Sequence, residues 1–138
     1  MRIRKAAKGD LDAIIAIDRI AATEEGRRQK IRGWVDGNSA IVALIDDQVV
    51  GYAAIDYTFF SQGFISMLVV QENHRRKGVA KSLIRHFEET CRTDKLFTST
   101  NESNGPMREL MAAVSFEPCG VVHNIDDGDP EIFYFKRL

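Results

Sequence analysis

Hydrophobic and polar positions along the chain follow two different periods. Leu11, Ile14 and Ile15 recur at the spacing of one helical face, and the apolar positions from Val79 onward recur every four residues. Elsewhere, apolar β-branched residues form short runs bounded by glycine, aspartate or asparagine, which is typical of strands. We expect the order β-α-α-β-β-β-α-β-α-β-β, with strands at residues 2–6, 40–45, 48–57, 63–70, 96–100, 116–123 and 131–136 and with helices beginning near residues 10, 23, 79 and 105. The strands at 40–45 and 48–57 are expected to form a hairpin that turns at Asp46-Asp47, and the third helix is expected to reach about residue 92.

The most informative stretch joins an apolar strand to an amphipathic helix. The strand at residues 68–70 is followed by three consecutive cations at positions 75–77, then by Gly78 and the helix. The amides at a helix N-terminus are free to bind an anion, and the helix dipole is positive there. Gly78 lets the backbone approach a ligand closely, and Ala80 is small. These features favour a pyrophosphate-binding loop, with a solvated basic turn as the alternative.

The spacing within this loop resembles a family signature. Arg75-x-x-Gly78-x-Ala80 resembles the (Gln/Arg)-x-x-Gly-x-(Gly/Ala) motif of the GNAT acetyltransferase superfamily. The loop has neither the Gly-Lys-Ser/Thr ending of a Walker loop nor the three glycines of a dinucleotide fingerprint. The order of the expected elements extends the resemblance over nearly the whole chain.

The C-terminal half carries a second part of the resemblance. Asn104, Leu110 and Phe116 match the motif in which an asparagine precedes a helix and a Gly-Phe pair ends it, although Ser115 stands here in place of the glycine. The resemblance implies an α/β fold with a GNAT-like mixed, mostly antiparallel sheet of six to seven strands and helices on both faces. It also implies that residues 1–138 form a single N-acetyltransferase domain.

The resemblance further implies a site for acetyl-CoA, the acetyl donor and cosubstrate. In the family, the strand before the loop diverges from the next strand, here residues 96–100, and the pantetheine arm bonds to free strand backbone groups. By that analogy the main chain near Val69 contacts the acetyl group and stabilises the developing oxyanion. The cofactor-binding residues implied are Leu68, Val69, Val70, Arg75, Arg76, Lys77, Gly78, Val79, Ala80, Lys81 and Asn104.

The resemblance leaves the proton-transfer groups open. The family's last helix often carries a tyrosine, a frequent general acid, five residues before the closing phenylalanine. That position is Met111 here, and methionine cannot donate a proton. We expect its side chain to pack in the hydrophobic core. Glu72, at the mouth of the strand, is the first candidate for the general base, with an exposed loop carboxylate as the alternative interpretation. Ser66 and Asp56 are further possibilities on adjacent strands.

The acceptor is expected to be a primary amine, either a small molecule, a peptide or a protein. Glu24 and Glu25 lie on the early helices that usually cover the acceptor site and could hold a cationic substrate; a solvated helix face is the alternative. The acidic turn at residues 126–130 could also attract an amine, or simply close a tight hairpin. The sequence does not distinguish a monomer from a homodimer.

Composition and charge narrow the classes of function that the chain could have. The 138 residues carry a net charge of -1, with a pI near 6.3, so no global field favours nucleic acid or a membrane surface. Cys91 and Cys119 are expected to be reduced thiols of a cytoplasmic protein, and no apolar run approaches transmembrane length. The histidines show no metal-ligand spacing, so no metal site is expected. A non-catalytic acyl-CoA-binding or sensing domain remains the alternative to an enzyme.

Overall fold

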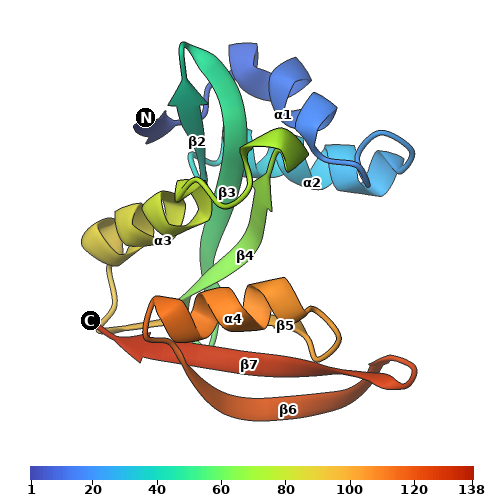
Figure 1. The fold of residues 1–138 in the computed structure, drawn as a ribbon, viewed down its shortest axis with the longest axis vertical. Helices are drawn as coiled ribbons and strands as arrows, with labels where there is room; N and C mark the ends of the chain where they lie inside the picture. Colours follow the sequence, from blue (N-terminus) through green and yellow to red (C-terminus); the bar gives the residue numbers. More distant parts are fainter. The chain divides into compact units, whose positions relative to one another are not determined.

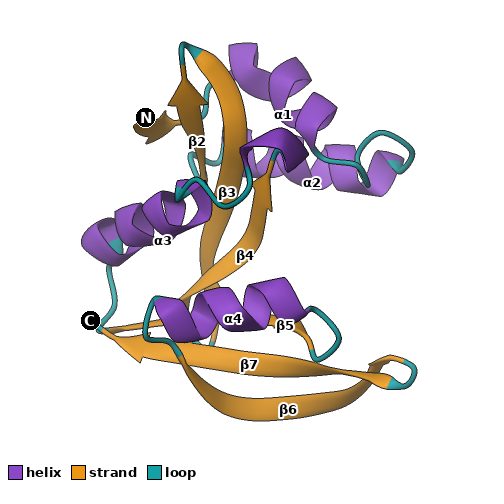
Figure 2. Ribbon diagram, in the orientation of Figure 1, coloured by secondary structure: helices purple, strands orange, loops and turns teal.

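The computed structural model describes all residues from Met1 to Leu138, and Figures 1 and 2 show the arrangement of its elements. Its strands and helices follow the order expected from the sequence. The elements are β1 (Arg2–Lys5), the short 3-10 helix η1 (Lys8–Asp10), α1 (Leu11–Ile17), α2 (Glu25–Asp36), β2 (Ala40–Ile45), β3 (Gln48–Phe59), β4 (Gln62–Val70), η2 (Glu72–His74), α3 (Val79–Thr90), β5 (Lys95–Asn101), α4 (Gly105–Ala113), β6 (Glu117–Asp126) and β7 (Asp129–Arg137).

The seven strands form one sheet in the order β1-β2-β3-β4-β5-β7-β6. The pairs β1–β2, β2–β3, β5–β7 and β6–β7 are antiparallel, whereas β4 and β5 run parallel. The parallel register covers only the three pairs from Gly63 with Leu96 to Ile65 with Thr98. Leu68, Val69 and Val70 of β4 lie outside this register, so that pairing does not use their backbone groups. The predicted mixed, mostly antiparallel sheet is confirmed.

The chain divides into two compact units that are not contiguous in sequence. The first unit contains Met1–Ile55 and Met67–Glu89, and the second contains Asp56–Ser66 and Thr90–Leu138. Strands β3 and β4 each contribute to both units. The expectation of a single domain over residues 1–138 stays a prediction.

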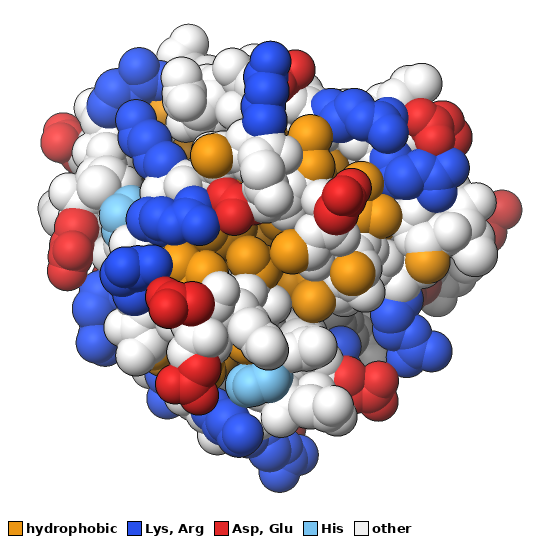
Figure 3. Space-filling model, turned by 90° about the horizontal axis from the view of Figure 1, so that it is seen from above, with side chains coloured by type: hydrophobic (Ala, Val, Ile, Leu, Met, Phe, Trp, Pro, Cys, Tyr) orange, Lys and Arg blue, Asp and Glu red, His pale blue; other side chains and the backbone are white.

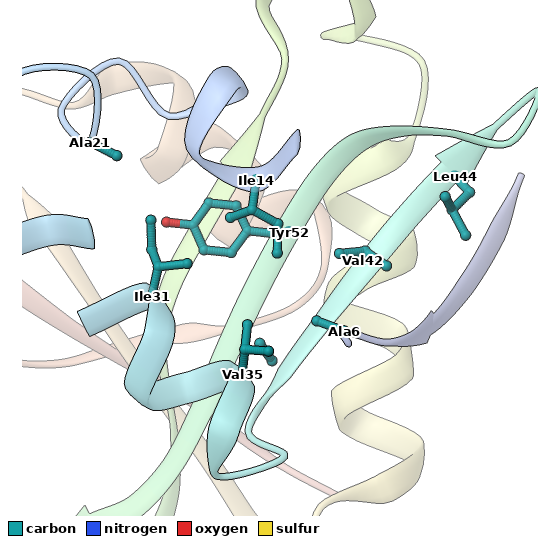
Figure 4. Packing of buried hydrophobic residues seen from close by; sticks show 9 residues of the cluster. Ala6, Ile14, Ala21, Ile31, Val35, Val42, Leu44 and Tyr52 are labelled. Carbon is teal, nitrogen blue, oxygen red and sulfur yellow. The ribbon is translucent and has the colours of Figure 1, made fainter. Parts of the chain in front are cut away.

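In the first unit, helices cover both faces of β3. Tyr52 lies in a core with Ile14 of α1 and Ile31 of α2, as Figure 4 shows. At the neighbouring residue, Gly51, a side chain would lie on the opposite face of the sheet, because successive side chains of a strand alternate between the two faces. A Cβ at Gly51 would lie 2.9 Å from a side-chain methyl of Val79, the first residue of α3. The start of α3 therefore packs directly on β3.

In the second unit, α4 is the one complete helix, and Figure 2 shows it among the strands. Asn104 caps it, because its side chain accepts a hydrogen bond of 3.2 Å from the amide of Met107. Met111 on this helix is completely buried, which confirms the interpretation of this residue as core packing. Phe59 of β3 contacts three further rings of this unit, those of Phe64, Phe97 and Phe133, at centroid distances of 4.9, 5.2 and 5.6 Å.

Several boundaries differ from the sequence expectation by a few residues. The helix expected from residue 23 begins at Glu25, and the helix expected to reach residue 92 ends at Thr90, which leaves Cys91 beyond it. Strand β6 continues to Asp126, so the expected five-residue acidic turn shortens to a tight turn at Gly128, whose φ is 76°. The hairpin expected between β2 and β3 is confirmed, with two left-handed residues as a two-residue turn requires. No helix combines the length and the apolar character needed to span a membrane.

An ion pair near the start of the chain, between Arg4 and Asp10, predicts how the free energy of unfolding depends on pH. Arg4 donates two hydrogen bonds, of 2.8 and 3.0 Å, to the carboxylate of Asp10. These bonds, aided by the amide of Ala7, outweigh burial and lower the pKa of Asp10 below its ordinary 3.8. A lowered pKa contributes stability above the unfolded value, and that stability is lost as the pH falls through the folded value.

We therefore expect Asp10→Asn to reduce the free energy of unfolding by about 2 kcal/mol at pH 7, as for hydrogen bonds to charged groups. The difference from wild type should shrink at pH 3. Urea unfolding at both pH values measures it, with the exposed Asp12→Asn on α1 as control. An equal cost of Asp10→Asn at both pH values would contradict the assignment.

Candidate functional site

The candidate site lies where β4 ends and α3 begins, entirely within the first unit. Backbone hydrogen bonding holds the chain as it leaves β4: the amide of Gln71 donates to the carbonyl of Val50 on β3 at 2.8 Å. The short helix η2 follows, and the amide of His74 closes it by donating to the carbonyl of Gln71 at 2.9 Å. The loop therefore starts from a fixed position on the sheet.

Two residues of the loop adopt left-handed backbone conformations. Arg76 has a φ of 62° and Gly78 a φ of 80°. A glycine adopts this region without cost, whereas other residues pay on the order of 1–2 kcal/mol. A Cβ at Gly78 would find no heavy atom within 4 Å, so the space beside the backbone is open at this point. The left-handed backbone thus explains why a glycine stands at position 78, and the open space beside it leaves room for a ligand.

The N-terminus of α3 presents unpaired amides beside that open space. Its first intrahelical hydrogen bond runs from the amide of Ser82 to the carbonyl of Gly78, at 3.0 Å. The amides of Val79, Ala80 and Lys81 therefore have no acceptor within the helix. Since Val79 is buried against Gly51, the helix end cannot move away from the sheet without losing this packing.

Three cations flank these amides. Arg75, Arg76 and Lys77 are exposed, and none of them takes part in an ion pair within the chain. Figure 3 shows one face of the molecule, with hydrophobic side chains gathered at its centre and basic and acidic side chains around them. Because the chain as a whole carries a net charge of -1, these three consecutive cations are a local feature, which suits a small anionic ligand rather than a long polyanion.

The carboxylates predicted for catalysis and acceptor binding have different environments. Glu72 is the first residue of η2 and is exposed. Glu24 is the N-cap residue of α2 and is also exposed. Glu25 accepts hydrogen bonds from Arg28 and Arg32 at 2.7 and 3.0 Å, which lower the pKa of its carboxyl group. Glu25 is thus already engaged with two cations, which leaves Glu24 the better candidate for a cationic acceptor.

The remaining predicted residues lie in the second unit. Ser66 donates a short hydrogen bond to Asp56, which also accepts bonds from the amide and the hydroxyl of Thr58. These bonds outweigh burial and lower the pKa of Asp56, which makes it a poor proton acceptor. The side-chain oxygen of Asn104 is engaged in capping α4. Its expected contact with the cofactor arm stays a prediction.

One feature of the first unit was not predicted from the sequence. Asp18, Arg27 and Tyr52 form a buried hydrogen-bonded network, although Tyr52 lies 34 positions from Asp18. An aspartate in a predicted connection and a tyrosine in an apolar strand give no local signal of such a contact. No group of three or more histidine, cysteine or acidic side chains is arranged to hold a metal ion.

Comparisons with known proteins agree with this geometry. The model of the acetyltransferase (GNAT) family matches residues 11–116. A GNAT-family acetyltransferase from Bacillus cereus ATCC 10987 has a crystal structure that superposes with a TM-score of 0.93 at 34% identity, covering 99% of this chain and 96% of that one.

Two further similarities concern individual enzymes. An N-alpha-acetyltransferase of Sulfurisphaera tokodaii is 27% identical over 146 residues, which cover 93% of this chain and 87% of the relative. An aminoglycoside 6'-N-acetyltransferase, whose structure contains coenzyme A, matches with a TM-score of 0.85 at 13% identity, over 99% of this chain and 97% of that one. The second similarity shows the fold alone.

Proposed function

The chain belongs to the GNAT acetyltransferase family and is an acetyltransferase, and from this premise we propose that it moves the acetyl group of acetyl-CoA to a primary amine in the cytoplasm. One observation carries the proposal: the loop before α3 combines a left-handed glycine, free helix amides and cations that lack partners. Backbone amides and a positive dipole at a helix N-terminus suit a pyrophosphate.

The residues that would hold the cosubstrate divide into two groups. The amides of Val79, Ala80 and Lys81, with the backbone of Gly78, would bind the pyrophosphate, and the cations at positions 75–77 would add charge. The main chain of residues 68–70 would bind the pantetheine arm and the acetyl group, since the three-pair register of β4 with β5 does not use it. Acetyl-CoA supplies the activated thioester carbonyl.

The reaction needs one proton removed and one charge stabilised. The neutral amine attacks the thioester carbonyl carbon, so that a C–N bond forms, the C–S bond breaks and the thiolate leaves. The amide of Val69 would donate a hydrogen bond to the carbonyl oxygen as negative charge develops there. Glu72 would take the proton from the amine, directly or through a water molecule. A thiolate whose conjugate acid has a pKa near 8.5 can leave without strong protonation, which fits Met111 at the usual tyrosine position.

For the acceptor, we propose the α-amino group of a peptide or protein. The support is the similarity to the N-alpha-acetyltransferase of Sulfurisphaera tokodaii over most of both chains. Glu24 would attract the cationic form of the amine as it approaches. A small-molecule amine is the other outcome of the experiment that follows.

The test is turnover of acetyl-CoA with a panel of peptides, free lysine and small amines. Mass spectrometry of the products would identify the acetylated atom, and free thiol release would give the rate. We expect acetylated peptide N-termini. Binding of acetyl-CoA in a thermal-shift assay, without turnover of any amine, would overturn the proposed reaction while leaving the binding site intact.

The exposed cations should contribute less to binding than the backbone. We expect Arg76→Ala and Lys77→Ala each to weaken CoA binding by about tenfold or less, because exposed charges contribute on the order of 1 kcal/mol or less and the helix amides remain. Isothermal titration calorimetry at two salt concentrations measures the effect, which should shrink at high salt. Arg85→Ala, an exposed cation further along α3, is the control. A loss above a hundredfold would mean that a side chain dominates the site.

A further inference from the structure

Asp18 is a buried carboxylate that the proposed chemistry does not use. It follows α1 directly and is only 2% exposed. One carboxylate oxygen accepts hydrogen bonds from the amides of Ile20 and Ala21, at 3.0 and 3.2 Å. The other accepts from Arg27 Nη1 at 2.8 Å and from Tyr52 Oη at 2.6 Å. Since a carboxylate offers about four lone-pair positions, the group is fully satisfied.

Tyr52 connects this carboxylate to the sheet. It is completely buried on β3, and Figure 4 shows its ring beside Ile14 and Ile31. Burial, reinforced by the bond to Asp18, raises the pKa of Tyr52 far above its ordinary range. Burial also raises the pKa of Asp18, but the bonds from Tyr52 and Arg27 outweigh it and lower that pKa overall. The tyrosine is therefore a permanent donor to a charged carboxylate, and its burial excludes contact with a substrate.

The network fixes the backbone of the connection between α1 and α2, residues 18–24. In addition to the two amides bonded to Asp18, the carbonyl of Ala21 accepts a hydrogen bond from Arg28 at 2.6 Å. The amide of Glu24 donates to the carbonyl of Ile20 at 2.9 Å. Ala21 is completely buried, whereas Ile20 is 45% exposed. Hydrogen bonds from side chains of α2 and β3, together with one backbone bond within the connection itself, thus hold it in place.

The same core reaches the strand that carries the proposed oxyanion contact. Met67 and Val69 of β4 pack against the cluster that contains Ala21 and Tyr52. Strand β3, which carries Tyr52, is also the neighbour of β4 in the sheet. The connection and the end of β4 therefore share one core within the first unit.

We propose that Tyr52 is a positioning residue for the acceptor: through Asp18 it holds the α1–α2 connection in place as one wall of the acceptor site beside Val69. This inference rests on the proposed function. It assigns Tyr52 no contact with either substrate. The network should therefore affect how the amine binds and leave acyl-CoA binding unchanged, because the pyrophosphate loop has no bond to it.

The test is Tyr52→Phe, which removes the hydroxyl and keeps the ring. We expect the KM for the acceptor amine to rise at least tenfold, the Kd for acetyl-CoA to stay within twofold, and hydrogen exchange at the amides of Ile20 and Ala21 to become faster. A purely structural role would lower the active fraction, and hence kcat, without changing the acceptor KM. Enzyme concentrations are therefore normalised to the CoA-binding stoichiometry.

Two further variants complete the experiment. Arg27→Gln breaks the network at its more exposed end and should raise the acceptor KM in the same way if Tyr52→Phe does not fold. Tyr57→Phe, on the same strand, removes a hydrogen bond from the amide of Arg92 and should leave the acceptor KM unchanged. An unchanged acceptor KM in both Tyr52→Phe and Arg27→Gln overturns the positioning role alone. A wild-type protein that acetylates no amine overturns the proposed function itself.

Discussion

Gly78→Glu is expected to weaken CoA binding by at least a hundredfold, about 2.7 kcal/mol, while the fold survives. The backbone at Gly78 is left-handed and borders open space, so a side chain can be accommodated there at the cost of some strain. That side chain would occupy the space in front of the free amides of α3. Its carboxylate would also repel the phosphates that these amides are proposed to bind. Calorimetric titration with CoA measures the loss.

Gly128→Glu is a closely matched control. Gly128 has a φ of 76° against 80° for Gly78, is exposed, and likewise has open space around the position of a Cβ. The two variants should therefore lose similar amounts of unfolding free energy, and only Gly78→Glu should lose CoA binding. CoA binding retained by Gly78→Glu would show that the phosphates bind elsewhere. Equal losses of binding in both variants would point to a general effect of the added charge or strain.

Glu72→Gln is expected to lower kcat by about a hundredfold or more if Glu72 is the general base, with acetyl-CoA binding unchanged. The glutamine keeps the size of the side chain and cannot accept the proton from the amine. Glu89→Gln, an exposed carboxylate of the same unit, makes the same change in charge and serves as control. A full rate and an unchanged pH profile in Glu72→Gln would mean that water removes the proton or that the amine is deprotonated before it binds.

The pH dependence of the wild-type reaction also reports on the acceptor. Because only the neutral amine is a nucleophile, kcat/KM should rise with pH and then level off. An α-amino group should level off near pH 8 and a lysine side chain above pH 10, following their ordinary pKa values. Since Met111 cannot donate a proton, no fall in rate is expected at high pH. Such a fall would reveal an essential acid elsewhere in the chain.

The sequence predicted the elements well because their signals are local. The continuous apolar run of β2 and the four-residue spacing in α3 are each contained in a short segment, and the structure has both elements where they were expected. The glycine and the cations before α3 belong to a motif of only a few residues, so the loop could also be predicted. Element ends were less predictable, because capping and hairpin closure depend on a few contacts at each terminus.

The network of Asp18, Arg27 and Tyr52 could not be predicted in the same way. Its three members come from a connection, a helix and a strand, and nothing near any of them indicates the others. The left-handed conformation of Arg76 could not be predicted either. Arginine has no preference for this region of φ and ψ, so the conformation is imposed by the surrounding loop. Local sequence patterns therefore did not predict the features that depend on contacts between distant segments of the assembled fold.

The interleaving of the two units has a consequence for synthesis on the ribosome. The first unit needs Met67–Glu89 in addition to Met1–Ile55, and the intervening segment Asp56–Ser66 belongs to the other unit. At about 5–20 residues per second, the N-terminal segment must wait several seconds before its missing strand and helix have been made. During that interval the apolar face of Gln48–Phe59 has neither β4 nor α3 to cover it. The nascent chain thus exposes an apolar strand face for that time before it can be buried.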